Sequence, residues 1–211
     1  MNLKNILFVR NTGNIIPKAP ITENLFGMKL SGGGEPAPTY FWDFTGATPL
    51  TDKIQGQVAK QTGTATYDEN GLTVASAGFY LQMGIPLKKG AKYVFEMGSM
   101  TRNFSRQGTI MRHGDQLDFC LLTIAGYWAV WIGSLWHNMG IGDSGTYFSN
   151  SIITFYMEPD GHISIYKDDV LVYRSSVTYN PSPSYQLQIG DRDYAFKNMT
   201  IKSLKVYEPE V

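Results

Sequence analysis

Apolar and polar residues alternate along most of the chain from residue 40 onward, with the period expected of strands that bury one face. The clearest segment is 153–175, in which three alternating runs are separated by the turns Pro159-Asp160-Gly161 and Asp168-Asp169. Tight turns between alternating runs are typical of antiparallel strands. The segment therefore predicts a three-stranded meander.

About a dozen short runs of this kind follow one another between Gly, Asn, Asp and Pro turns, and none has a helical period. This pattern predicts an all-β fold, a two-sheet antiparallel sandwich. The first run, 40–44, and the last, 199–207, lie at opposite ends of the domain, and we expect them to pair in one sheet. Residues 135–149 are rich in Gly, Asn and Ser and are predicted to form the largest loop.

The first 30 residues lack this alternation and are interrupted by Asn, Gly and Pro. Residues 1–30 are too irregular to fold alone, so they form either a disordered tail or an arm that becomes ordered on a partner. The apolar anchoring contacts of such an arm are Ile6, Leu7, Phe8, Leu25, Phe26 and Met28. Residues 31–39, SGGGEPAPT, are predicted to be a Gly/Pro linker that spans about 28 Å when extended. Residues 40–211 form the predicted sandwich.

Composition narrows the classes of partner. Lys plus Arg and Asp plus Glu number 18 each, so the net charge is zero and no basic stripe predicts nucleic-acid binding. No apolar run approaches the roughly 20 residues of a membrane span, and the N-terminus does not resemble a signal peptide. The single cysteine, Cys120, lies in an apolar run and is expected to be a buried hydrophobe. A chain without a disulfide is compatible with assembly in a cytosol.

Candidate chemistry is sparse. His113 and His162 are predicted to lie at exposed turns, and no Cys/His spacing predicts a zinc site. Asp143, Asp191 and Asp193 offer scattered oxygens but no dense calcium loop, so they are expected to be solvated acids. No nucleophile elbow or phosphate loop is present in the sequence. We therefore expect no enzymatic activity, no cofactor and no metal.

The aromatic segment 126–138, GYWAVWIGSLWHN, is the best candidate for ligand binding. Trp128 and Val130 share one face of a strand and Trp131 lies on the other, so at least one face is core. Trp136 leads into the predicted loop and is expected to be exposed, where an aromatic ring beside polar groups can stack on a sugar. The candidate glycan-binding residues are Trp136, His137, Asn138, Asp143 and Tyr147. The alternative is that Trp136 packs beneath the loop or against a neighbouring subunit.

Three stretches resemble a known family. The segment 153–175, ITFYMEPDGHISIYKDDVLVYRS, resembles the central strands of concanavalin A-like (laminin-G-like) jelly-roll domains, and LQIGDRDYAFKNMTIKSLKVY at 187–207 resembles their closing strands. YFWDFTG at 40–46 resembles their first strand. The resemblance covers about residues 40–207 and implies a jelly roll. Glycosidases of this fold carry Glu-x-Asp-x-x-Glu on one strand, and this spacing is not present in the sequence.

The order of arm, linker and sandwich also resembles that of bacteriophage virion accessory and tail proteins. This resemblance implies a structural protein located in the virion and assembled in the host cytoplasm. Its arm would bind other virion proteins, and the sandwich would be displayed as a homo-oligomer that contacts host-surface glycans. A free bacterial lectin-like module is the alternative, and a sandwich without a ligand is a third reading.

Overall fold

The computed structural model describes residues 36–74, 78–100, 108–122, 127–142, 146–191 and 199–209, together with 10–11 and 14–15. The chain divides into two compact units, Met1–Pro36 and Ala37–Val211. In the first unit, β1 (Arg10–Asn11) pairs antiparallel with β2 (Asn14–Ile15). The predictions that fall outside the described residues concern Ile6, Leu7, Phe8, Leu25, Phe26, Met28, Asp143, Asp193 and the side chain of Cys120.

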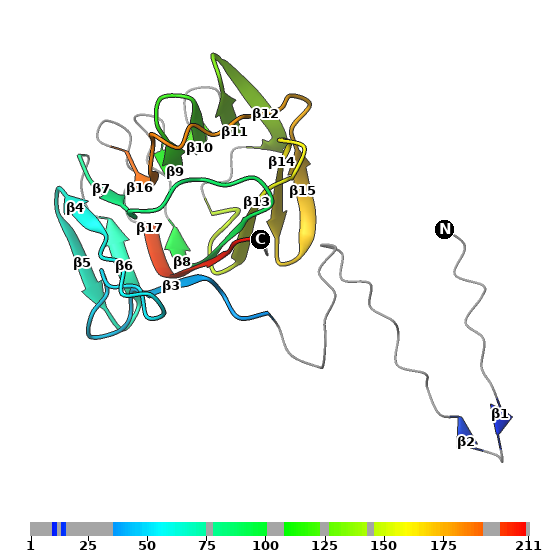
Figure 1. Ribbon diagram of the computed structural model, residues 1–211, viewed down its shortest axis with the longest axis horizontal. Coiled ribbons are helices and arrows are strands. Elements are labelled where there is room, and N and C mark those ends of the chain that lie inside the picture. The colour runs from blue at the N-terminus through cyan, green and yellow to red at the C-terminus, as the bar shows by residue number, and fades with distance from the viewer. Residues whose placement is uncertain are drawn as a thin grey trace. The chain divides into compact units, whose positions relative to one another are not determined.

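The second unit contains two antiparallel sheets (Figure 1). One sheet has seven strands, in the order β12-β11-β10-β9-β16-β7-β4. Their bounds are Leu135–Gly142 (β12), Tyr127–Ile132 (β11), Leu117–Leu122 (β10), Gly108–His113 (β9), Leu187–Gly190 (β16), Tyr80–Gln82 (β7) and Lys60–Thr62 (β4). Among the described residues, no helix is long and apolar enough to cross a bilayer.

The other sheet has eight strands, in the order β15-β14-β13-β8-β17-β6-β5, and β3 also pairs with β17. Their bounds are Val170–Arg174 (β15), Ile163–Lys167 (β14), Ile152–Met157 (β13), Lys92–Met100 (β8), Met199–Tyr207 (β17), Gly71–Val74 (β6), Ala65–Asp68 (β5) and Tyr40–Asp43 (β3). The predicted meander is confirmed as β13, β14 and β15. The predicted pairing of the first and last runs is also confirmed, since Trp42 lies opposite Leu204.

The core lies between the two sheets and is formed by the alternating apolar residues of both. Trp42 of β3 and Phe155 of β13 are fully buried on the side of the eight-stranded sheet, and Trp128 and Phe119 are buried on the other side. Two antiparallel sheets around one such core fit a jelly roll. The predicted all-β sandwich is therefore confirmed.

The predicted loop at 135–149 is wrong for its first half. Residues 135–142 form β12, which pairs with β11 through the register Trp131↔Trp136 and Ala129↔Asn138. The turn between these strands contains Gly133, whose φ of +68° suits glycine. The glycines predicted a loop because glycine has little intrinsic preference for an extended backbone. In the folded sheet, the free backbone edge of β11 offers hydrogen-bond partners, and residues 135–142 pair with it as an edge strand.

The prediction that His113 lies at an exposed turn is also wrong. His113 is the last residue of β9 and is fully buried. Its Nε2 lies 3.2 Å from the backbone oxygen of Tyr185, and its Nδ1 lies 2.8 Å from the hydroxyl of Tyr179. Nε2 must therefore donate to the carbonyl, while Nδ1 accepts from the tyrosine hydroxyl. Burial lowers the pKa of His113, so the native imidazole is neutral.

We expect the stability conferred by His113 to depend on pH. Because burial lowers its pKa from 6.5 in the folded protein, the unfolded chain takes up a proton first as the pH falls. The contribution of His113 to the free energy of unfolding is therefore complete above pH 6.5 and decreases as the pH falls below this value. Denaturant unfolding at about pH 7.5 and 5.5 measures the free energy of unfolding of the wild type and of His113→Gln. We expect the wild type to be the more stable protein, by a smaller margin at the lower pH. Two proteins whose stabilities change in parallel would contradict it.

Candidate functional site

One row of side chains crosses the whole seven-stranded sheet on the face turned away from the core. The register places each of them opposite the next, on strands β12, β11, β10, β9, β16, β7 and β4 in turn. Its members are Trp136, Trp131, Asp118, Arg112, Gln188, Gln82 and Lys60. We call this face, defined by these seven residues, the outer face. Successive residues of a strand point to opposite sides, and the neighbours of Asp118, Leu117 and Phe119, belong to the core.

Two tryptophans form the aromatic end of the row. The ring centroids of Trp131 and Trp136 are 4.9 Å apart and the ring planes meet at 61°, an edge-to-face arrangement. Both side chains are half-buried. The indole Nε1 of Trp131 donates a hydrogen bond of 3.3 Å to the backbone oxygen of Asp115. This bond and the neighbouring ring fix the orientation of Trp131 at the surface.

Next to the tryptophans lies a charged cluster, defined as Arg112, Asp115, Asp118 and Asp191, which we call the Arg112 cluster. The Arg112 Nη2 lies 2.5 Å from Asp115 Oδ1, and Nη1 is in close contact with Asp191 Oδ2. Arg112 Nε lies 3.4 Å from Asp118 Oδ1, but it donates its hydrogen to the backbone oxygen of Gly114 at 2.6 Å. The contact with Asp118 is therefore an ion pair without a hydrogen bond.

Asp118 is the unusual member of the cluster. The residue is only 8% exposed, and its Oδ1 atom is buried without a hydrogen-bond partner. Burial raises the pKa of this carboxyl to about 6, against the opposing effect of the Arg112 charge, while Asp115 adds a smaller upward effect. An unsatisfied buried acceptor is costly in a native protein, and such groups are often found at functional sites.

The structure brings together only part of the predicted glycan site. Trp136 belongs to the outer face, and Asn138, two residues further along β12, is exposed and accepts a hydrogen bond from Gly140 N at 2.8 Å. His137 alternates with them and lies opposite Val130, a core residue. Tyr147 packs against Phe148 at a centroid distance of 4.8 Å and lies under Lys167 Nζ of β14 at 5.3 Å, so it contacts the other sheet.

Most of the polar residues of this site are not predicted by the sequence. Asp118 left one signal, since it is the only charged residue in the apolar run LDFCLL of β10. Trp131 was expected on the face opposite Trp128, and the burial of Trp128 assigns it to the outer face. The sequence gives no sign that Arg112 meets Asp191, because Asp191 directly follows β16, which is adjacent to β9 only in the folded sheet.

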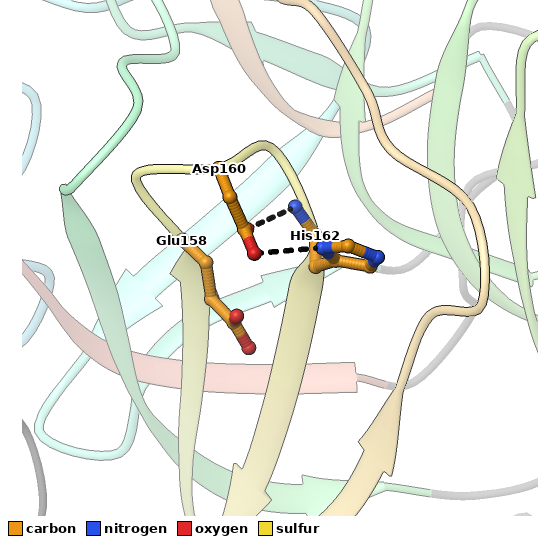
Figure 2. A group of neighbouring side chains, drawn as sticks. All are labelled: Glu158, Asp160 and His162. Atoms are coloured by element: carbon orange, nitrogen blue, oxygen red, sulfur yellow. Dashed lines mark hydrogen bonds and ion pairs between the residues drawn. The ribbon is translucent and has the colours of Figure 1, made fainter.

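A group of possible metal ligands occupies the turn between β13 and β14. One ligand atom each of Glu158, Asp160 and His162 lie within 4.8 Å of one another. Figure 2 shows that Asp160 faces His162, while the carboxylate of Glu158 points away from this pair. Arg174 donates two hydrogen bonds to Glu158, at 2.9 and 2.7 Å.

These contacts lower the pKa of Glu158, with the Arg174 hydrogen bond as the largest cause. Ser164 also donates to Glu158, and Arg174 approaches Asp160 at 3.5 Å. A cation would have to displace this guanidinium. The group is therefore an ion-pair network that ties the β13–β14 turn to β15.

No protein-family profile matches the sequence, and no curated protein matches it. Solved structures do match the fold. Domain 4 of AbnA, an extracellular GH43 arabinanase from Geobacillus stearothermophilus in complex with arabinotriose, superposes with a TM-score of 0.60 and 15% identity, over 83% of this chain and 94% of that domain. The Trypanosoma rangeli sialidase gives a TM-score of 0.60 and 14% identity, over 84% of this chain and 32% of that enzyme.

The binding domain of botulinum neurotoxin serotype D gives a TM-score of 0.55 and 12% identity, over 83% of this chain. These likenesses establish the fold. The chain spans about half of the toxin domain, 49%, and about a third of the sialidase, so it corresponds to one β-sandwich within each of them.

Proposed function

We propose that this protein is a non-enzymatic carbohydrate-binding protein, whose site is the tryptophan end of the outer face. The observation that carries the proposal is the half-buried pair of Trp131 and Trp136 beside Asp118, a buried carboxylate with an unsatisfied oxygen. Asn138 on the same side of β12 supplies a further polar group.

The chemistry of sugars supports this assignment. A pyranose or furanose ring presents apolar C–H faces that pack on indole rings, and hydroxyls that need hydrogen-bond partners. Both kinds of group lie here on adjacent strands, which hold side chains more rigidly than loops do. The AbnA domain, which matches over nearly its whole length, was solved with arabinotriose. We therefore place arabino-oligosaccharides and host-surface oligosaccharides first among the ligands to screen.

Replacing Trp136 by alanine is expected to weaken oligosaccharide binding by about tenfold or more, because it removes half of the stacking surface. A glycan array identifies a ligand, and calorimetry measures the affinity of the wild type and the variant. Recovery of the ligand intact after long incubation checks that no hydrolysis takes place.

Tyr147→Ala is the matched control, since this aromatic residue contacts Lys167 and Phe148 instead of the outer face. It is expected to leave the affinity unchanged. If both Trp136→Ala and Trp131→Ala bind the oligosaccharide with full affinity, the tryptophan end of the outer face is not the binding site and the proposal is wrong.

The finer proposal concerns the setting of this domain. We propose that it is displayed on a bacteriophage particle as a homo-oligomer whose first 30 residues bind other virion proteins. The proposal rests on the layout of the chain, which divides into Met1–Pro36 and Ala37–Val211. A chain lacking residues 1–36 is expected to fold and to be lost from purified particles. If it is incorporated normally, the anchoring role is wrong, and a free bacterial lectin-like module becomes the better proposal.

A further inference from the structure

We propose that the outer face selects neutral sugars, which donate a hydroxyl hydrogen to the carboxylate of Asp118, and that it rejects sugars carrying a carboxylate. This inference rests on the proposed carbohydrate-binding function and specifies its ligand class.

Arg112 is the cation of the Arg112 cluster. The forked donors of an arginine match a carboxylate in geometry and charge, so a free arginine is the preferred residue for holding an acidic sugar. Arg112 is not free, since each of its three nitrogens faces a protein oxygen. Nε donates to Gly114 O, Nη2 contacts Asp115, and Nη1 contacts Asp191. A ligand carboxylate would have to compete with these contacts for the same guanidinium.

The Arg112 cluster also carries more acidic than basic groups. Three carboxylates face the single guanidinium of the Arg112 cluster, so the cluster has an excess of negative charge when they are ionised. The other cation of the row, Lys60, lies four strands from Asp118, about 19 Å away at the usual strand spacing. That separation exceeds the Debye length at physiological salt, so Lys60 does not offset the repulsion of an anion near Trp131.

Asp118 itself is a hydrogen-bond acceptor beside the tryptophans. With a pKa of about 6, its carboxyl is mostly ionised at neutral pH, and an ionised carboxylate only accepts hydrogen bonds. Its side chain keeps 12% of its surface exposed, directly beside Trp131 in the neighbouring strand. Because Oδ1 itself is buried, a sugar stacked on the tryptophans brings its hydroxyl donors to the part of the Asp118 side chain that stays exposed. A hydrogen bond to a charged group is among the stronger ones available to a ligand.

The test compares oligosaccharides that differ only in charge. Galacto-oligosaccharides are matched with galacturono-oligosaccharides of the same linkage, and sialylated glycans with the same glycans methyl-esterified at the sialic acid carboxyl group, on the full-length protein. We expect binding to the neutral member of each pair. Asp118→Asn is expected to lower that affinity by about 10-fold or more and to reduce the discrimination against the acidic member. The variant keeps the size of the side chain and removes a buried charge, so it is expected to fold.

Asp169→Asn is the control with the same change in net charge, since Asp169 lies in the β14–β15 turn with a φ of +64° that asparagine accepts. A second readout is pH. Affinity of the wild type is expected to fall between about pH 7 and 5 as Asp118 gains a proton, beside Arg112, Asp115 and Asp191, whereas Asp118→Asn shows a smaller change.

The outcomes separate the two proposals. Stronger binding of the acidic members, or an unchanged affinity in Asp118→Asn, overturns the neutral-sugar inference and leaves the carbohydrate-binding function standing. Binding of no glycan by the folded protein overturns the function and the inference together.

Discussion

Replacing Arg112 by alanine is expected to lower the free energy of unfolding by about 3 kcal/mol, because it breaks a partly buried set of ion pairs. The variant removes the positive charge beside the buried Asp118 and the close contact of Arg112 with Asp191, which is only 1% exposed. The value is at the lower end of the usual cost of breaking a buried ion pair, because the Arg112 side chain keeps 21% of its surface exposed. Denaturant unfolding at neutral pH measures the change.

The loss in Arg112→Ala is expected to shrink as the pH falls, because protonation of Asp118 removes a buried charge that the arginine neutralises. Burial raises the pKa of Asp118 to about 6, so this change falls in the range between about pH 7 and 5. Arg174→Ala is the control, since Arg174 forms a similar set of ion pairs in an exposed position, where such pairs contribute little. An Arg112→Ala variant as stable as the wild type would show that the cluster is solvated and not buried.

Replacing Phe148 by alanine is expected to lower the free energy of unfolding by about 3–5 kcal/mol, the usual cost of removing a buried phenylalanine ring. Phe148 is fully buried and meets Trp128 at a centroid distance of 4.8 Å and Phe119 at 5.5 Å, both edge-to-face. These two partners come from β11 and β10, the strands that also carry Trp131 and Asp118 on the opposite face. The cavity that Phe148→Ala creates would therefore lie directly behind the candidate site.

Thermal or denaturant unfolding of Phe148→Ala tests this, with Leu171→Ala as the control. Leu171 is also a large apolar residue, but it is 49% exposed in β15, so its truncation is expected to have little effect. We expect weaker sugar binding in Phe148→Ala as well, because the strands that hold the tryptophans lose support. A small change in stability would mean that residues 146–150 do not pack against the core.

The fold was largely predictable because its signal is local. Period-two alternation in 153–175 and the Asp/Gly turns between its runs specify strands and their inward faces without reference to other parts of the chain. The burial of Trp42 and Phe44 and the pairing of β3 with β17 follow from the same pattern. The one large misassignment, β12, occurred where glycines weaken the local signal and a neighbouring strand decides the conformation.

The candidate site was only partly predictable because it is assembled across strands. Trp136 and Asn138 were predicted from an aromatic residue beside polar ones, which is a local pattern, and the structure places both on the same side of β12. Tyr147 was assigned to the same site because it is near in sequence, but it contacts the other sheet. His113 was assigned to a turn, and the chain around Tyr179 and Tyr185 buries it.

The sequence by itself thus determined the strand content, the sandwich and the inward face of each run, because side-chain direction in a strand follows from residue parity. Only the tertiary structure decided that Trp131, Asp118 and Arg112 form one row and that Asp191 closes the cluster. The register of neighbouring strands determines these contacts, including the irregularity between Phe119 and Cys120 where β10 meets β9. Register depends on how both sheets pack around the common core, and no stretch of the chain specifies it alone.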